Sequence, residues 1–268
     1  MGKRVGSFFL FLTLILTSAL WGSEEAGKVI SFQGKAQVFN PGANEWKELK
    51  VNQKIFPAEV LKTGKNSNLK ILLKDNSTVI LQSESKLTIK RVSILLDKAY
   101  RDVLLNLEKG MARFKISRGY AKNSRFEVVT PLTQIRVEKT DFTVRVISES
   151  QTRVGVREGS LNLRLKNFDL TLNTGDALIL KEEMGKIILD VLGGDVEVGL
   201  KGVVIRVGEG ESISIDSTGR VEVIRGEIDV YFAGKHYTFG EGESFYPEEL
   251  YLGVRVPTGE GAASPATP

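Results

Sequence analysis

Two nearly identical hexapeptides, VGEGES at 207–212 and FGEGES at 239–244, hold the residue types best suited to binding chemistry. Their glycines could let the backbone approach a phosphate, and the two glutamates of each could offer oxygens to Ca²⁺. A phosphate loop needs its glycines to lead into a helix N-terminus, whereas SISI and SFYP follow here. The RTX nonapeptide and the EF-hand loop are also absent. We therefore interpret both hexapeptides as turns and predict no metal site and no cofactor.

Residues that could catalyse a reaction are few. The chain has no cysteine, and its one histidine, His236, falls in an alternating stretch that indicates a strand. A Gly-x-Ser-x-Gly elbow and a His-Glu-x-x-His helix are absent. We predict that the protein is not an enzyme and assign no catalytic residue. A carboxylate-based hydrolase stays open as an alternative, because aspartate and glutamate are plentiful and their separation cannot be read from the sequence.

The hexapeptides occupy equivalent points of a longer repeat. Gly159, Gly194 and Gly226 are each followed sixteen residues later by a second glycine and then an acid. Apolar and polar residues alternate on both sides of a turn within each interval, which predicts a hairpin and one further strand after the Gly-acid turn. We expect a positive φ at Gly210 and Gly242. These turns are Gly175-Asp176, Gly210-Glu211 and Gly242-Glu243.

Composition favours an all-β fold. The 27 glycines are spread among β-branched and aromatic residues, which favours many short strands joined by turns. No stretch shows a sustained helical period with caps. Because the units recur at nearly constant intervals, we predict repeated short strands and hairpins stacked as a β-solenoid-like array or an elongated sandwich.

The first residues have the layout of a secretory signal peptide. Lys3 and Arg4 precede an apolar run that ends in small residues. This run is short for crossing about 30 Å of hydrocarbon. We therefore predict cleavage near Gly22, a periplasmic or secreted protein, and no stable transmembrane span after cleavage. An N-terminal anchor in the inner membrane is the alternative.

Charge gives little reason to expect nucleic-acid binding. The formal net charge is +4 and falls by two when Lys3 and Arg4 leave with the signal. Basic residues are interleaved with acidic ones, and no Lys/Arg run reaches the roughly 5 to 8 residues of a phosphate-tracking patch. We predict that nucleic acid is not a partner.

A series of motifs upstream of the repeats follows the order of a known family. They are Trp46 with Leu49, AEVLKT at 58–63, Asp75-Asn76-Ser77, Leu107 to Gly110, Thr130-Pro131, EKTDF at 138–142 and EGSL at 158–161. Over about residues 27–180 the chain resembles the FecR-type periplasmic domain. That family has Gly-Asp where Ala58-Glu59 stand and Arg-Gly where Glu138-Lys139 stand. We therefore expect the turns at these two points to differ or to carry strain. The resemblance also implies a core position for Trp46.

The resemblance implies a role in signalling or binding. The family is best known for membrane regulators that pass a signal from an outer-membrane transporter to a cytoplasmic sigma factor. Only four residues precede the apolar run here, so we expect no cytoplasmic anti-sigma segment and no direct contact with a sigma factor. We predict an exported, non-catalytic module that binds another cell-envelope component, either an envelope protein or a membrane-spanning partner, as an interaction, scaffold or accessory signalling domain.

A glycan or cell-wall binding module is the alternative. Such modules present exposed aromatic platforms, for which Trp46, Phe245, Tyr246 and Tyr251 are the candidates. We interpret these side chains as packing in the core or at a sheet edge.

The chain is predicted to have four parts. A signal peptide at 1–22 is followed by a FecR-like β domain at 23–186. Two further three-strand β repeat units occupy 187–256. A disordered tail at 257–268 is indicated by its Gly, Ala and Pro content.

Overall fold

The computed structural model describes residues 24–95, 99–117, 120–121 and 123–253. Within these ranges the chain forms 22 strands and one short helix, α1 (Pro247–Tyr251). The all-β prediction is therefore confirmed. The predicted signal peptide at 1–22 and the predicted tail at 257–268 lie outside the described residues.

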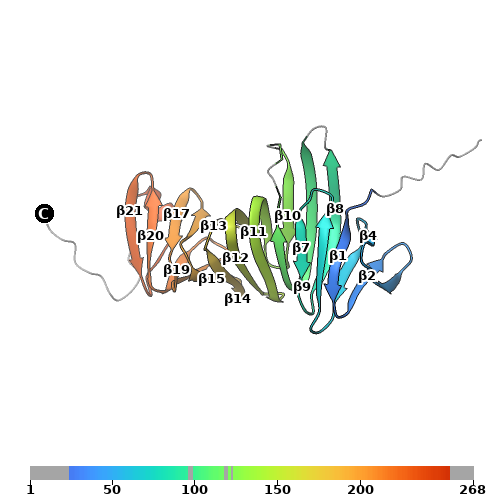
Figure 1. Cartoon of the computed structure of the whole chain (residues 1–268). Helices are drawn as coiled ribbons and strands as arrows, with labels where there is room; N and C mark the ends of the chain where they lie inside the picture. Colours follow the sequence, from blue (N-terminus) through green and yellow to red (C-terminus); the bar gives the residue numbers. More distant parts are fainter. Residues whose placement is uncertain (1–23, 96–98, 118–119, 122, 254–268) are drawn as a thin grey trace, which may run out of the picture.

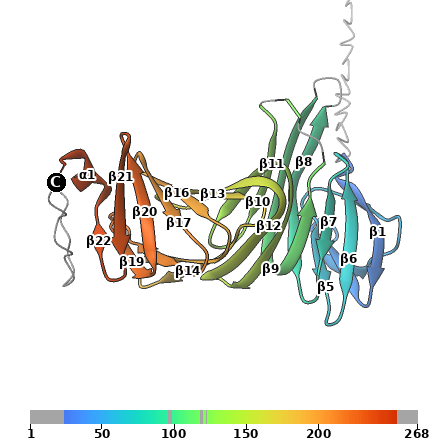
Figure 2. The same cartoon turned by 60° about the vertical axis from the view of Figure 1, so that its left-hand side comes forward.

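The strands are hydrogen-bonded into one continuous sheet that folds into two facing layers, which we call layer A and layer B. Figures 1 and 2 show an elongated, curved molecule in which the chain advances from one end to the other. Layer A holds, in spatial order, β3 (Glu45–Glu48), β2 (Ala36–Asn40), β5 (Val60–Thr63), β8 (Lys86–Leu95), β10 (Arg125–Val129), β13 (Asp169–Asn173), β16 (Val196–Leu200), β17 (Val203–Val207), β20 (Glu227–Phe232) and β21 (Lys235–Gly240).

Layer B lies on the other side of the core. Its strands follow the same order along the long axis, so each end of the molecule has both layers. They are β4 (Lys54–Ile55), β1 (Gly27–Gln33), β6 (Asn68–Leu73), β7 (Thr78–Leu81), β14 (Ala177–Glu183), β15 (Lys186–Gly193), β18 (Ser212–Ile215), β19 (Val221–Arg225) and β22 (Ser244–Phe245).

Three long strands in the middle take part in both layers: β9 (Tyr100–Lys115), β11 (Gln134–Ser148) and β12 (Gln151–Arg164). The first half of β9 pairs with β8 and β10, and its end pairs with β7 and β11. The change of layer coincides with Gly110 and Gly159, which have φ values of 85° and 89°. A Cβ at Gly159 would lie 2.4 Å from the Lys139 carbonyl oxygen. Glycine is needed there because the strands approach closely at the bend.

Strand alternation builds the core between the layers. In β16, for example, Val196, Val198 and Leu200 are buried, while Glu197 and Gly199 face outward. Among the described strands only the β9–β10 pair is parallel. This antiparallel arrangement agrees with the elongated-sandwich alternative.

The first two repeat units contain four strands rather than the predicted three, whereas the third contains the predicted three, β20, β21 and β22. The second unit supplies the hairpin β16–β17 to layer A and the hairpin β18–β19 to layer B. The fourth strand was missed because its apolar residues occupy both faces: β15 reads KIILDVLG, and both Leu189 and Leu192 are apolar although only Leu189 is buried. The predicted boundary between residues 186 and 187 falls inside β15 and stays a proposal.

The two unusual turn positions behave differently. Ala58 has a φ of 70°, in the same left-handed region as Gly175, Gly210 and Gly242, whose φ values are 97°, 84° and 83°. The prediction of positive φ at Gly210 and Gly242 is thus confirmed. Glu138-Lys139 forms no turn, because it lies within β11 at a register shift opposite β12.

Candidate functional site: a polar face on layer A

The outward face of layer A carries a row of polar side chains in direct cross-strand register. Antiparallel pairing places the Cβ atoms of such partners about 5 Å apart. The row therefore forms one continuous surface from β10 to β21. Its members, in spatial order, are Glu127, Arg136, Asn162, Thr171, Glu197, Arg206, Asp229 and Thr238.

Neighbouring members of the row hold each other in place. The Arg136 guanidinium donates to Glu127 Oε1, with Nη2 at 2.7 Å and Nε at 3.1 Å, and Gln134 Nε2 donates to Glu127 Oε2 at 2.7 Å. Arg206 Nε donates to Glu197 Oε1 at 3.2 Å. Because one charge of each pair stays partly exposed, the row presents oriented donors and acceptors to a partner.

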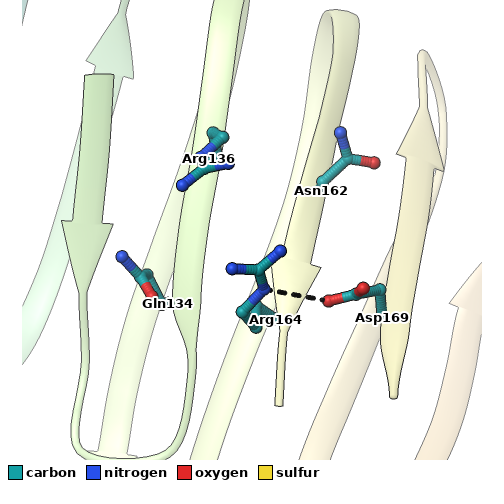
Figure 3. A pocket seen from close by; sticks show the side chains of 5 residues that line it. All are labelled: Gln134, Arg136, Asn162, Arg164 and Asp169. Carbon is teal, nitrogen blue, oxygen red and sulfur yellow. Dashed lines mark hydrogen bonds and ion pairs between the residues drawn. The ribbon is translucent and has the colours of Figure 1, made fainter. Parts of the chain in front are cut away.

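A shallow pocket of about 180 Å³ lies where β11, β12 and β13 meet (Figure 3). Arg164 Nε is 3.4 Å from Asp169 Oδ1, and both side chains are largely exposed. The pocket offers two guanidinium groups, two amides and one carboxylate, which suits hydrogen bonding to a polar group. Its lining residues are Gln134, Arg136, Asn162, Arg164 and Asp169.

This pocket contains no catalytic pair. A two-carboxylate mechanism needs a second acid across the cleft, and Asp169 is the one carboxylate in the lining. His236, which was predicted to lie in a strand, is in β21. Its Nε2 atom is 2.6 Å from Asp229 Oδ1, and its ring stacks on Tyr231 at 4.9 Å. It contributes to the layer A face as a polar surface residue.

The acids of the hexapeptides close their own turns. Glu211 Oε2 accepts from the Gly208 backbone N–H, and Glu243 Oε2 from that of Gly240, both at 2.6 Å. Asp176 Oδ2 accepts from Asn173 in the same way, also at 2.6 Å. The described part of the chain gathers no three His, Cys, Asp or Glu side chains into a group that could hold a metal ion.

The aromatic candidates are largely used within the fold. Trp46 is 43% exposed rather than buried, because β3 pairs only with β2 at the edge of layer A, where the ring packs against Phe39 at 5.4 Å. The expectation of a core position for Trp46 was therefore wrong. Phe245 is buried, and Tyr251 packs on Phe232 at 4.3 Å and donates to the Lys201 carbonyl. Tyr246 precedes α1 and is partly exposed.

A buried ion pair was not predicted. Arg101 Nη1 lies 2.9 Å from Asp75 Oδ2, and both side chains are almost fully buried. Arg101 also donates to the Glu138 carbonyl at 2.5 Å and packs over the Tyr120 ring. This pair anchors the β6–β7 turn to β9 and β11, which is a structural role. Asp75 was recognisable as a turn residue, but no local pattern pointed to Arg101.

The chain is thus an all-β sandwich with an extended polar face. Its central part is similar to a known family. Residues 59–162 match the family described as FecR protein. The predicted resemblance is confirmed for residues 59–162, which we call the FecR-type region.

Solved structures with some similarity are few, and no curated protein matches the chain. Two crystal structures of a candidate anti-sigma factor from Parabacteroides distasonis ATCC 8503 share 18% identity with it at a TM-score of 0.41. The match covers 49% of this chain and 59% of that one. The wild-type TCP10 domain of Danio rerio CPAP shares 10% identity over 69% of this chain and 98% of that one, with a TM-score of 0.14.

No helical segment among the described residues has the length and apolarity that crossing a membrane requires.

Proposed function

We propose that this protein is an exported, non-catalytic FecR-type protein that binds another cell-envelope component through the polar face of layer A. One observation carries the proposal. The polar row begins on β10 inside the FecR-type region and continues in register to β21 in the added repeat units. The added units therefore extend the surface of the FecR-type region.

The dimensions of this face suit a protein partner. Strands lie about 4.8 Å apart, so the row from β10 to β21 is roughly 34 Å long. A stable interface buries about 800 Å² per partner, and a face of this length can supply it. Arginine is enriched in interfaces, and alternating charges favour specificity and correct register more than raw affinity. A row of acids and arginines therefore supports selective binding.

The expected partner is an envelope protein or a membrane-spanning protein. FecR-type domains belong to signalling regulators, so an accessory signalling role is the natural context for this chain. Any signal would pass through the partner, because we expect no direct sigma-factor contact. A periplasmic or secreted location follows from the N-terminal pattern.

The test is site-specific cross-linking in cells with charge-reversed variants. Arg136→Glu and Arg206→Glu together should abolish a cross-link that forms from a photoreactive residue at Thr171. Lys181→Glu is the matched control, because Lys181 is paired with Asp190 on layer B. Capture of the same partner by the Arg136→Glu, Arg206→Glu double variant and by Lys181→Glu would contradict the proposal. Recovery of a sigma factor would contradict the exported location.

A further inference from the structure

A second hollow lies on the outward face of layer B and is lined by three arginines. The groove has a volume of about 380 Å³. Arg145 extends from β11, and Arg153 and Arg157 extend from β12. Small residues, Gly155 and Ala177, form the floor between them. The remaining lining residues are Met111, Thr143, Val156, Gly175 and Asp176.

The side chains of these three arginines lack the partners that the other arginines of the described ranges have. No side-chain hydrogen bond or ion pair connects the guanidinium group of Arg145, Arg153 or Arg157 to another described residue. Arg157 acts on Asp141 only through longer-range attraction. Every other arginine in the described ranges has a partner within hydrogen-bonding distance. Those arginines are Arg91, Arg101, Arg113, Arg125, Arg136, Arg164, Arg206, Arg220 and Arg225.

The arrangement works against stability. Arg145 and Arg153 are direct cross-strand partners, and like charges in this position repel each other. No acid on β14 compensates, because Arg153 faces Ile179 on that side. A sheet optimised for stability alone would place an acid or a neutral residue at one of these positions. The uncompensated charge therefore points to a ligand.

The acids nearest the groove do not neutralise it. Asp141 is held by Arg113, whose Nη2 lies 2.6 Å from Asp141 Oδ2. Asp176 turns its carboxylate toward the backbone N–H groups of Asn173, at 2.6 Å, and Asp195, at 3.3 Å. The guanidinium groups of the three lining arginines stay available to an anion.

We propose that this groove binds a small organic polyanion carrying at least two phosphate or carboxylate groups. Arg145 and Arg153 form one end of the site and Arg157 the other. Arg157 lies four positions along the strand from Arg153, so the backbone positions of the two ends are about 13 Å apart. A volume near 380 Å³ lies within the range of small-molecule sites. The site lies on the opposite layer from the proposed protein-binding face and goes beyond that function.

Calorimetric titration of the full chain at low ionic strength provides the test. Tripolyphosphate should bind about tenfold more tightly than inorganic phosphate, because only the longer anion can approach both ends. Arg153→Gln should lower the affinity for both anions by about tenfold or more. It should also raise or preserve the melting temperature, because the repulsion from Arg145 is relieved. Arg157→Gln should reduce the advantage of tripolyphosphate and leave phosphate binding unchanged.

Two further variants separate the groove from general charge attraction. Gly155→Leu keeps every charge but fills the floor, and a Cβ there meets its nearest neighbour, Ala177 Cβ, at an ordinary 3.7 Å. This variant should fold and lose binding. Arg225→Gln removes the same charge elsewhere on layer B and should bind normally. Wild-type protein that binds neither anion, or equal affinity in Arg153→Gln, would overturn the proposal, as would an equal loss in Arg225→Gln. None of these outcomes depends on the layer A cross-link.

Discussion

At the residue scale, one carboxylate geometry recurs in four turns of the protein. In each turn the acid accepts the backbone N–H three residues earlier, and the residue just before the acid has a positive φ. Glycine occupies that position in three of the turns, where it avoids the Cβ strain of the left-handed region. In the fourth turn, Glu59 accepts from Phe56 at 2.9 Å and Ala58 takes the strained position.

Ala58→Gly should therefore stabilise the protein. Removing the strain of an alanine at left-handed φ stabilises the folded state by about 1 to 2 kcal/mol. The greater conformational freedom of glycine in the unfolded chain offsets about half of this gain. We expect a net gain of about 0.5 to 1 kcal/mol in the free energy of unfolding, measured by denaturant titration. Ala112→Gly, in the buried part of β9, is the control and should destabilise. A lower free energy of unfolding in both variants would contradict the strain assigned to Ala58.

Asp141 should make stability depend on acid pH. Its hydrogen bond with Arg113, opposed by burial and aided by nearby positive charges, lowers the pKa of Asp141 below 3.8. A lowered folded pKa contributes stability that is present above pH 3.8 and is lost as the pH falls through the folded value. Wild-type protein should lose more stability than Asp141→Asn between pH 4 and pH 2, measured by thermal unfolding.

Asp176 provides the contrast of opposite sign. Burial raises the pKa of Asp176 above 3.8, although backbone hydrogen bonds act against this. Between pH 3.8 and the folded pKa, Asp176 holds its proton more tightly in the folded state than in the unfolded state. Its contribution to stability therefore falls as the pH rises through this range. Asp176→Asn should flatten that slope and keep an acceptor for the Asn173 N–H. A slope of the same sign for both aspartates would show that the burial argument is wrong.

At the scale of the element, the Gly-acid turn is the joint that passes the chain from layer A to layer B. The Gly210 N–H donates to the Val191 carbonyl, and the Val191 N–H donates to the Glu211 carbonyl. Gly242 and Glu243 bind Val223 in the same manner. Each turn is thus tied to the last strand of the preceding unit, which explains why the turn sequence recurs.

Gly210→Ala should lower the free energy of unfolding by about 1 to 2 kcal/mol. No atom lies within 4 Å of the added Cβ, so the cost comes from the φ of 84° alone. Gly199→Ala in β16, whose added Cβ would meet the Asp169 carbonyl oxygen at an ordinary 3.8 Å, is the control and should be neutral or stabilising. Millimolar calcium should leave the melting temperature of both proteins unchanged, and a rise of several degrees would instead identify the glutamates as ligands.

At the scale of the whole molecule, two layers present two different surfaces. Layer A has paired acids and arginines along its length, which suits an extended partner. Layer B concentrates unpaired arginines over a floor of small residues in its middle. The long strands β9, β11 and β12 connect the two layers, and β11 and β12 contribute residues to both the polar row and the groove.

Removal of residues 194–268 should abolish partner binding while the remaining chain still folds. The cut follows β15, so it leaves the FecR-type region and its first four-strand unit intact. We expect the envelope cross-link to be lost, because the polar row then ends at Thr171, while the exposed edges of β13 and β15 lower solubility. Cross-linking and sedimentation of both chains would measure this. A retained cross-link in soluble truncated protein would show that the added units only cap the sandwich.

The sequence by itself determined the all-β class, the repeat, the positive φ of Gly210 and Gly242, and the likeness of the central region to FecR-type domains. These depend on local chemistry: a period of two in burial and the conformational freedom of glycine. Only the tertiary structure decided that Arg145 faces Arg153, that Arg101 reaches Asp75, and that the second unit supplies one hairpin to each of the two layers. Such contacts depend on the register between strands and on where the long strands bend, and a one-residue slip would send every side chain to the other face.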